Sequence, residues 1–142
     1  MFKFSKRSYR NLKDIHPELI TVLVISIKNS PYDFTLTNGV RTTSDQRELY
    51  AKGRTLPGNI VTNSDGIQTF SKHQIQSDGF GYAVDLYPYF NGTVHTEGED
   101  VNLRLTAIAR HIIKTAKELD ITIQWGGDWK NFKDTPHFEL KK

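Results

Sequence analysis

The apolar residues of this chain follow a helical spacing in two segments. In VNLRLTAIARHIIKTAKEL, residues 101–119, they recur every three to four positions, which predicts an amphipathic helix. Residues 17–28, PELITVLVISIK, are apolar at most positions and begin with a proline, so they predict a largely buried helix. His16 or Asp14 is placed to cap this helix, although its many β-branched residues also permit a strand.

Four other segments have the pattern of strands. Residues 33–40, DFTLTNGV, alternate and end in Asn-Gly, which is typical of a strand followed by a turn. Residues 81–90, GYAVDLYPYF, predict a buried strand, and ITIQW and PHFEL predict two short strands on either side of a Gly-Gly turn. This mixture, with strands concentrated late in the chain, predicts an α+β fold with a small antiparallel sheet.

Residues 43–53, TSDQRELYAKG, predict a short helix that Ser44 caps and Gly53 ends, with Gln46, Leu49 and Tyr50 on its packed face. Residues 54–80 are rich in Gly, Asn, Ser and Asp and hold few apolar anchors. A loop of that length inside a compact domain is usually functional or mobile. Because no repeat or linker interrupts the chain, we expect residues 1–142 to form a single domain with packed helices and one cleft.

The amino-acid composition restricts which metal ligands the chain can use, but it says little about the cellular compartment. The chain has no cysteine, which excludes disulfides and cysteine-ligated zinc, so a metal site must use His, Asp, Glu or backbone oxygen. A net charge of +3 favours polyanionic surroundings without choosing among them. The N-terminus lacks a signal-peptide pattern and no apolar run is long enough to span a bilayer, so we expect a protein made in the cytosol without a stable membrane anchor. We also expect it to be a monomer. The chain lacks a concentrated stripe of Lys and Arg, so we expect no nucleic-acid partner.

Two of the five histidines stand where metal binding is plausible. His73 leads through a glycine-rich segment to Asp85, which occupies a strand position where another valine is expected, and His137 closes the run DTPH. Two imidazoles and one carboxylate supply three zinc ligands and leave a fourth position for water. A metal would also compensate the desolvated Asp85. The remaining histidines are expected at a helix cap, in a solvated loop and on a solvated helix face: His16, His95 and His111.

Asp134 is the candidate general base. It precedes His137 by three residues, so one tight turn would let both side chains face the same cleft. The alternative is that Asp-Thr-Pro forms a turn without chemistry. Spacing alone supports the two interpretations equally.

Several motifs occur together in the order found in one enzyme family. The chain resembles the LAS-type zinc peptidases, whose pattern is S-x-H-x-x-G-x-A-x-D followed by E/D-x-x-H. The segment GVRTTSDQRELYAKGRT is similar to the one that carries the family's substrate-binding arginine, here Arg41. WGGDW and PHFEL are most similar to the phage L-alanyl-D-glutamate endopeptidases, and the resemblance extends over about residues 35–140. The matching motif positions are Ser71, His73, Gly81, Ala83, Asp85, Asp134 and His137.

The resemblance implies a role for each matching residue. His73, Asp85 and His137 would hold Zn²⁺, and Asp134 would pass a proton from water to the leaving amine. Arg41 would bind a substrate carboxylate or carbonyl, unless it forms a structural ion pair with Asp45 or Glu48 on the short helix. Ser71 would support the site and the substrate, or it is only a turn residue.

One departure from the pattern lies between His73 and Asp85, which are twelve positions apart instead of seven. The extra residues Gln74, Gln76 and Asp78 are expected to form a solvated loop rather than to touch substrate or an ion. Two further features stay open: Trp125 and Trp129 belong either to the core or to the cleft wall, and Glu139 is either a partner of His137 or a surface carboxylate.

The resemblance implies zinc-dependent hydrolysis of the L-alanyl-D-glutamate bond in bacterial peptidoglycan. The corresponding biological role is that of a phage endolysin, which reaches the host cell wall once another protein has permeabilised the membrane. Two alternatives remain, a D-Ala-D-Ala carboxypeptidase and a non-catalytic, zinc-containing wall-binding module. The presence of Asp134 argues against the second alternative, since a binding module has no need of a base.

Overall fold

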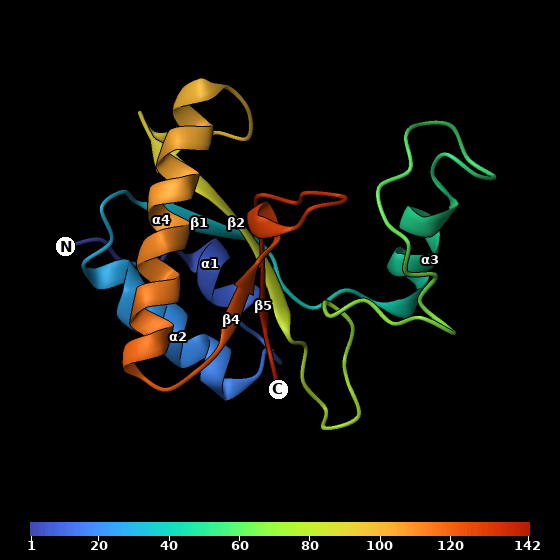
Figure 1. The fold of residues 1–142 in the computed structure, drawn as a ribbon, viewed down its shortest axis with the longest axis horizontal. Helices are drawn as coiled ribbons and strands as arrows, with labels where there is room; N and C mark the ends of the chain where they lie inside the picture. The colour runs from blue at the N-terminus through green and yellow to red at the C-terminus, as the bar shows by residue number, and fades with distance from the viewer.

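Five strands form one antiparallel sheet in the computed structural model, which describes all residues 1–142. The order is β1–β2–β5–β4, and the short β3 pairs with the far end of β2. This confirms the predicted α+β fold, and Figure 1 shows the helices labelled α1, α2 and α4 gathered around the sheet. The strands are β1 (Phe34–Asn38), β2 (Ala83–Phe90), β3 (Thr93–Val94), β4 (Ile123–Trp125) and β5 (His137–Leu140).

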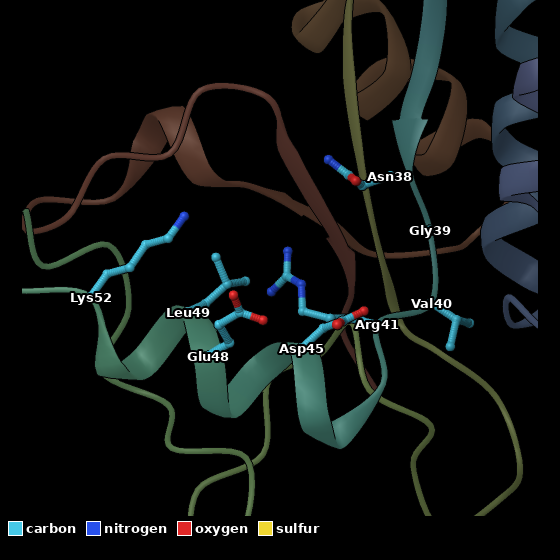
Figure 2. A pocket seen from close by; sticks show the side chains of 8 residues that line it. All are labelled: Asn38, Gly39, Val40, Arg41, Asp45, Glu48, Leu49 and Lys52. Atoms are coloured by element: carbon cyan, nitrogen blue, oxygen red, sulfur yellow. The ribbon is translucent and has the colours of Figure 1, made fainter. Parts of the chain in front are cut away.

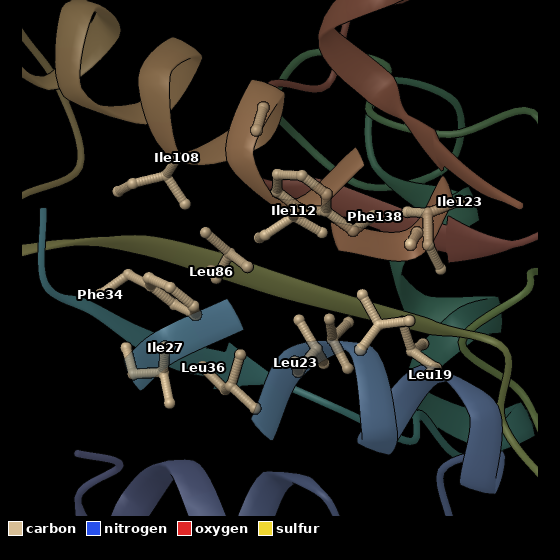
Figure 3. Close-up of a cluster of buried hydrophobic side chains, with 14 of the residues drawn as sticks. Leu19, Leu23, Ile27, Phe34, Leu36, Leu86, Ile108, Ile112, Ile123 and Phe138 are labelled. Carbon is tan, nitrogen blue, oxygen red and sulfur yellow. The ribbon is translucent and has the colours of Figure 1, made fainter. Parts of the chain in front are cut away.

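The hydrophobic core lies between one face of the sheet and two helices, α2 (Pro17–Lys28) and α4 (Glu99–Glu118). Leu86 and Phe138 from the sheet meet Leu23 and Ile112 from the helices, and all four side chains are fully buried (Figure 3). Successive residues of a strand point to opposite faces. Asp85 and His137 are therefore directed away from this core, which is where a polar site can form.

A short helix that the sequence did not predict, α1 (Lys6–Asn11), covers the free edge of β1. The Ser8 hydroxyl accepts a hydrogen bond from the Leu36 backbone N–H at 3.0 Å, and the Asn11 side chain donates to the Leu36 carbonyl oxygen at 2.8 Å. These two side chains satisfy backbone groups that an edge strand leaves open. Phe4 and Leu12, on either side of α1, join the core.

The predicted helix boundaries were confirmed in part. α2 has the expected bounds, and the His16 ring accepts a hydrogen bond from the Glu18 N–H, so His16 and not Asp14 is its cap. The short helix α3 (Thr43–Ala51) is capped by Thr42, so the prediction of Ser44 was wrong. Thr42 is the N-cap because its backbone is extended, as a cap requires, whereas Ser44 already lies inside the helix.

The segment that contains α3 stands to one side of the sheet and helices (Figure 1). No residue from Thr37 to Gly81 belongs to the hydrophobic core cluster. The segment is instead held by polar side chains, which are described with the site below. None of the helices is both long enough and apolar enough to cross a lipid bilayer.

Candidate metal centre

Three side chains from distant parts of the chain bring one ligand atom each to a common point. The Nε2 atom of His73 lies 3.2 Å from Nδ1 of His137 and 3.3 Å from Oδ1 of Asp85. Nδ1 of His137 lies 3.6 Å from the same Asp85 oxygen. All three residues are buried, and together they form a group that suits a metal ion.

The sheet positions two of these residues and a loop supplies the third. Asp85 on β2 and His137 on β5 are direct cross-strand neighbours, so their side chains emerge side by side from the same face. His73 comes from the segment between α3 and β2, where the Arg41 N–H donates to the His73 carbonyl oxygen at 2.8 Å. The structure thus brings together the three residues that the sequence singled out.

Hydrogen bonds on the outer side of each imidazole fix which nitrogen faces inward. Nδ1 of His73 lies 3.0 Å from the Gly39 carbonyl oxygen, and Nε2 of His137 lies 2.8 Å from Oε1 of Glu139. Because both partners are acceptors, these outer nitrogens carry the hydrogen and the inner ones present lone pairs. A carbonyl or carboxylate on the outer nitrogen is the arrangement found around histidines that bind metals.

The donor set fits a tetrahedral zinc site. Oδ1 of Asp85 is buried and has no hydrogen-bond donor, although buried polar atoms are normally paired. Ligands about 2.0–2.1 Å from zinc lie about 3.3 Å from one another in a tetrahedron, which is close to the three distances above. The arrangement therefore calls for a cation at the point where the three ligand atoms meet.

The pKa values of Asp85 and His137 also indicate that the cluster favours a positive charge. Burial disfavours the ionised form of Asp85, yet the imidazoles of His137 and His73 hold its pKa well below the usual range. Burial also disfavours protonated His137, but Asp85 and Glu139 outweigh this effect and raise its pKa to about 9. Two carboxylates thus favour a positive charge here, which either a proton or a metal ion can supply.

Asp134 lies at the rim of this cluster. Its Oδ2 atom is 3.8 Å from Nδ1 of His137, and its side chain is about half-exposed. Burial and the neighbouring Asp85 carboxylate raise the pKa of Asp134 against the opposing effect of His137, His73 and Arg41. A raised pKa helps a carboxyl group to accept and return a proton near neutral pH.

The turn that carries Asp134 depends on Gly126, the first residue of the 3₁₀ helix η1 (Gly126–Asp128). The Asp134 N–H donates to the Gly126 carbonyl oxygen at 3.1 Å, and a Cβ atom on residue 126 would collide with the Asp134 carbonyl oxygen. The Asp-Thr-Pro turn and the candidate base are therefore both present. The structure shows the turn and places the Asp134 carboxylate beside the cluster, and its role as a base stays a prediction.

Arg41 lies between the candidate metal ligands and α3, and Gln46 of α3 holds its guanidinium by a hydrogen bond. Its Nη1 donates to Oε1 of Gln46 at 2.8 Å, and its Nη2 lies 3.9 Å from Oδ2 of Asp85. The alternative ion pair with Asp45 or Glu48 is not formed, because neither carboxylate lies within 4.0 Å of the guanidinium. A positive charge is thus held beside the cluster.

Ser71 shapes the backbone in front of His73. Its hydroxyl accepts a hydrogen bond from the His73 N–H at 3.1 Å, and its own N–H donates to Oε1 of Gln74 at 2.9 Å. Ser71 also lines the larger cavity beside the cluster. The turn-forming role expected for Ser71 is therefore present.

Buried glutamines join α3 to the loops, which sequence reasoning missed. Gln74 is only 2% exposed, and its amide donates to the Gly66 carbonyl oxygen and to the Thr43 hydroxyl. Gln76 is half-buried and donates to the carbonyl oxygens of Ser71 and Gln74. The expectation that Gln74 and Gln76 are solvated was wrong, because their partners come from segments that only the folded chain brings together.

The structure also decides between the alternatives left for the two tryptophans. Trp125 is in the core, whereas Trp129 tilts against His137 and lines the larger cavity. Asp78 is exposed, as expected, and its carboxylate accepts a hydrogen bond from the Tyr82 hydroxyl.

The other histidines lie outside the metal cluster. His95 stacks on Phe90 and bonds to its carbonyl oxygen. His111, expected on a solvated face, instead contacts the Ser26 carbonyl oxygen at 3.0 Å, so that prediction was wrong. It faces α2, against which α4 packs.

Two cavities meet at Arg41 and Leu49, which line both. The larger has a volume of about 620 Å³ and includes His73, Asp134 and His137. The smaller, about 370 Å³, lies between α3 and the chain that leaves β1. Figure 2 shows Asp45, Glu48 and Lys52 extending from the α3 segment into this smaller cavity.

Glu139 offers a test of the outer hydrogen bonds. We expect Glu139→Gln to weaken zinc binding by about 10–100-fold, because an amide oxygen orients His137 but lacks the charge that raises its basicity. The check is competition with a chromophoric chelator at fixed pH. Glu118→Gln, an exposed change at the end of α4, is the matched control. Unchanged zinc affinity in Glu139→Gln would remove Glu139 from the site.

Gln46 offers a test of how Arg41 is held. Gln46 is fully buried, accepts from Arg41 and donates to the Ser64 carbonyl oxygen at 2.8 Å. We expect Gln46→Met, which keeps the volume, to lower the free energy of unfolding by about 1–3 kcal/mol, since it leaves these partners unpaired. It should also lower kcat/KM, and add little to the loss caused by Arg41→Ala. Additive losses in this double-mutant cycle would mean that Gln46 acts independently of Arg41.

Comparison with known proteins agrees with this geometry. A family model described as phage L-alanyl-D-glutamate peptidase matches residues 1–141. The peptidoglycan L-alanyl-D-glutamate endopeptidase CwlK of Bacillus subtilis is 33% identical over 89% of this chain and 74% of its own length. The L-alanyl-D-glutamate peptidase of Escherichia phage T5 is 32% identical over 99% of this chain and 90% of its own.

Solved structures share the fold. The L-Ala D-Glu endopeptidase ChiX of Serratia marcescens superposes with a TM-score of 0.74 and 30% identity, over 98% of this chain and 90% of its own. The vancomycin resistance D,D-dipeptidase VanXYg gives a TM-score of 0.53 at 15% identity, over 89% of this chain and 50% of its own, which is a likeness of fold alone. On the match over residues 1–141 and these relatives, the chain belongs to the phage L-alanyl-D-glutamate peptidase family.

Proposed function

We propose that the protein is a zinc-dependent endopeptidase that hydrolyses the L-alanyl-D-glutamate bond of peptidoglycan stem peptides and serves as a phage endolysin. The observation that carries this proposal is the cluster of His73, Asp85 and His137, with Asp134 at its rim in a cleft. The activities named for CwlK, the phage T5 peptidase and ChiX support the choice of bond.

In this mechanism His73, Asp85 and His137 hold the zinc ion. When bound, zinc supplies Lewis-acid polarisation of a carbonyl and a water of lowered pKa. Asp134 accepts the proton of the attacking water at its carboxylate and returns it to the amine that leaves. Its raised pKa and half-exposed position suit this two-step role.

Arg41 and Ser71 bind and orient the substrate in this proposal. The Arg41 guanidinium, fixed by Gln46, donates hydrogen bonds to a substrate carboxylate or carbonyl and favours the negative charge that develops during attack. Ser71 holds the backbone before His73 in place and faces the same cavity.

The two cavities favour an endopeptidase over a carboxypeptidase. An endopeptidase must hold chain on both sides of the bond that it cuts. The larger cavity contains the metal cluster, and the smaller one adjoins it at Arg41 and Leu49, so each can hold one side of a substrate chain. We propose that the protein acts as a monomer on the cell wall after another protein has permeabilised the host membrane.

The test uses chelator-stripped protein and Gram-negative cell walls whose outer membrane has been removed. One equivalent of zinc is added to half of the samples, and turbidity and new free amino termini are followed together. The expected result is zinc-restored clearing with new N-terminal D-glutamate. Release of single D-alanine would instead identify a carboxypeptidase, and zinc binding without any new termini would identify a wall-binding module.

A further inference from the structure

The smaller cavity is a groove that opens directly beside the reaction centre. It lies between α3 and residues Asn38–Arg41, which leave the end of β1 (Figure 2). Two of its residues contact the outer oxygen of the metal ligand Asp85: Asn38 donates to Oδ2 at 3.4 Å, and Arg41 lies 3.9 Å from the same atom. A substrate that passes the metal on this side must enter the groove.

The groove is lined by charges of both signs that do not neutralise one another. Of its eight lining residues, four are charged. Glu48 and Lys52 are one helical turn apart, a spacing at which ion pairs commonly form, yet neither has an ion-pair partner within 4.0 Å. Asp45 is also without one, and all three side chains are exposed. The charged lining residues are Arg41, Asp45, Glu48 and Lys52.

The larger cavity has a different character. Ile60, Val61, Phe70 and Phe132 line it, and all four are exposed in spite of their apolar side chains. Exposed apolar side chains that are grouped in a cavity mark a binding surface. The larger cavity, which also holds the metal cluster and Lys72 and Lys133, thus offers more apolar contacts than the groove, and Arg41 lines both.

The substrate of the proposed function has the same asymmetry. On one side of its scissile bond, L-alanine is joined to a muramic acid sugar and carries no charge. On the other side, the D-glutamate carries a free carboxylate and is followed by a diamino acid with an ammonium group. In walls that contain meso-diaminopimelate, that diamino acid also carries a side-chain carboxylate.

We infer that the groove between α3 and Asn38–Arg41 is a subsite for the zwitterionic diamino acid of the stem peptide, an assignment that rests on the proposed function. Glu48 and Asp45 pair with the ammonium group, and Lys52 pairs with the side-chain carboxylate. Arg41 binds the D-glutamate carboxylate between this groove and the metal. The sugar and the L-alanine occupy the larger cavity.

The experiment compares three soluble substrates with the zinc-loaded full chain: muramyl-L-Ala-D-Glu, and the same molecule extended by meso-diaminopimelate or by L-lysine, each with the main-chain carboxyl of the diamino acid amidated. Products are quantified by liquid chromatography and mass spectrometry to give kcat/KM. We expect either diamino acid to raise kcat/KM by about ten-fold, as charge-assisted hydrogen bonds do. Glu48→Gln should remove most of this gain for both extended substrates, mainly through KM. Lys52→Gln should remove it only for the meso-diaminopimelate substrate.

The exposed α4 changes Glu118→Gln and Lys117→Gln are the charge-matched controls and should keep the full gain. The assignment is overturned if the wild type cleaves the short and extended substrates equally well. It is also overturned if Glu48→Gln and Lys52→Gln keep the wild-type ratio of kcat/KM between the extended and the short substrates. Failure of the wild type to cleave any of the three would reject the proposed function itself, and that result is distinct from cleavage without preference.

Discussion

Asp134→Asn is expected to lower kcat by about 10²–10⁴-fold while the protein still binds one zinc ion. Asparagine keeps the size of the side chain and the turn with Gly126, which depends only on backbone atoms of residue 134. What it loses is the ability to accept a proton from water and to return it to the leaving amine. The measurement is the rate of appearance of N-terminal D-glutamate, with the zinc content determined on the same sample.

The matched control is Asp128→Asn, in the same turn region, where the carboxylate pairs with Arg110 at the surface. This variant should keep its rate, because Asp128 lies outside the cavity that contains the metal cluster. Equal rates for wild type and Asp134→Asn would show that another group moves the proton.

Asp85→Asn is expected to weaken zinc binding by more than about 100-fold and to abolish turnover. The lower bound follows because changes in groups that only support a ligand already cost about 10–100-fold, and here a charged ligand itself is lost. The amide also presents a hydrogen-bond donor to two imidazole nitrogens that must remain free for the metal. Isothermal titration with zinc at fixed pH gives the affinity directly.

Thermal unfolding provides a second measurement on the same variant. A ligand present at about 1,000 times its Kd stabilises the folded state by about 4 kcal/mol, so zinc should raise the Tm of the wild type clearly. It should leave the Tm of Asp85→Asn nearly unchanged. Asp100→Asn, in the exposed first turn of α4, is the control. An equal rise in Tm for Asp85→Asn and the wild type would place zinc elsewhere.

The sequence predicted the elements whose hydrophobic pattern is regular. α4, β1, β4 and β5 were expected from the period of their apolar residues, whereas α2 and β2 were expected from dense apolar content and α3 from its capping residues. α1 was missed because the central residue of its buried face is Ser8, whose hydroxyl bonds to Leu36 in place of packing as an apolar side chain. A two-residue strand such as β3 has too few positions to show a period.

The candidate site was predictable where its residues have a local sequence signal. His73, Asp85 and His137 stood out by residue type and spacing, and the structure places their ligand atoms together. Gln46 was correctly expected on the packed face of its helix, but its hydrogen bonds were not predicted, and Gln74 was expected to be solvated because a loop glutamine normally is. Only the folded chain brings the carbonyl oxygens of Ser64 and Gly66 to their amides.

The absence of core residues between Thr37 and Gly81 has a consequence for motion. Local opening costs less free energy than global unfolding when a segment buries few apolar side chains. We therefore expect the segment that carries α3 to open locally while the sheet, α2 and α4 remain folded. Amide hydrogen exchange should accordingly be faster in residues 43–70 than in β2 or α4. Under the proposed function, such opening would let a crosslinked polymer, which offers no free chain end, enter the cleft from the side.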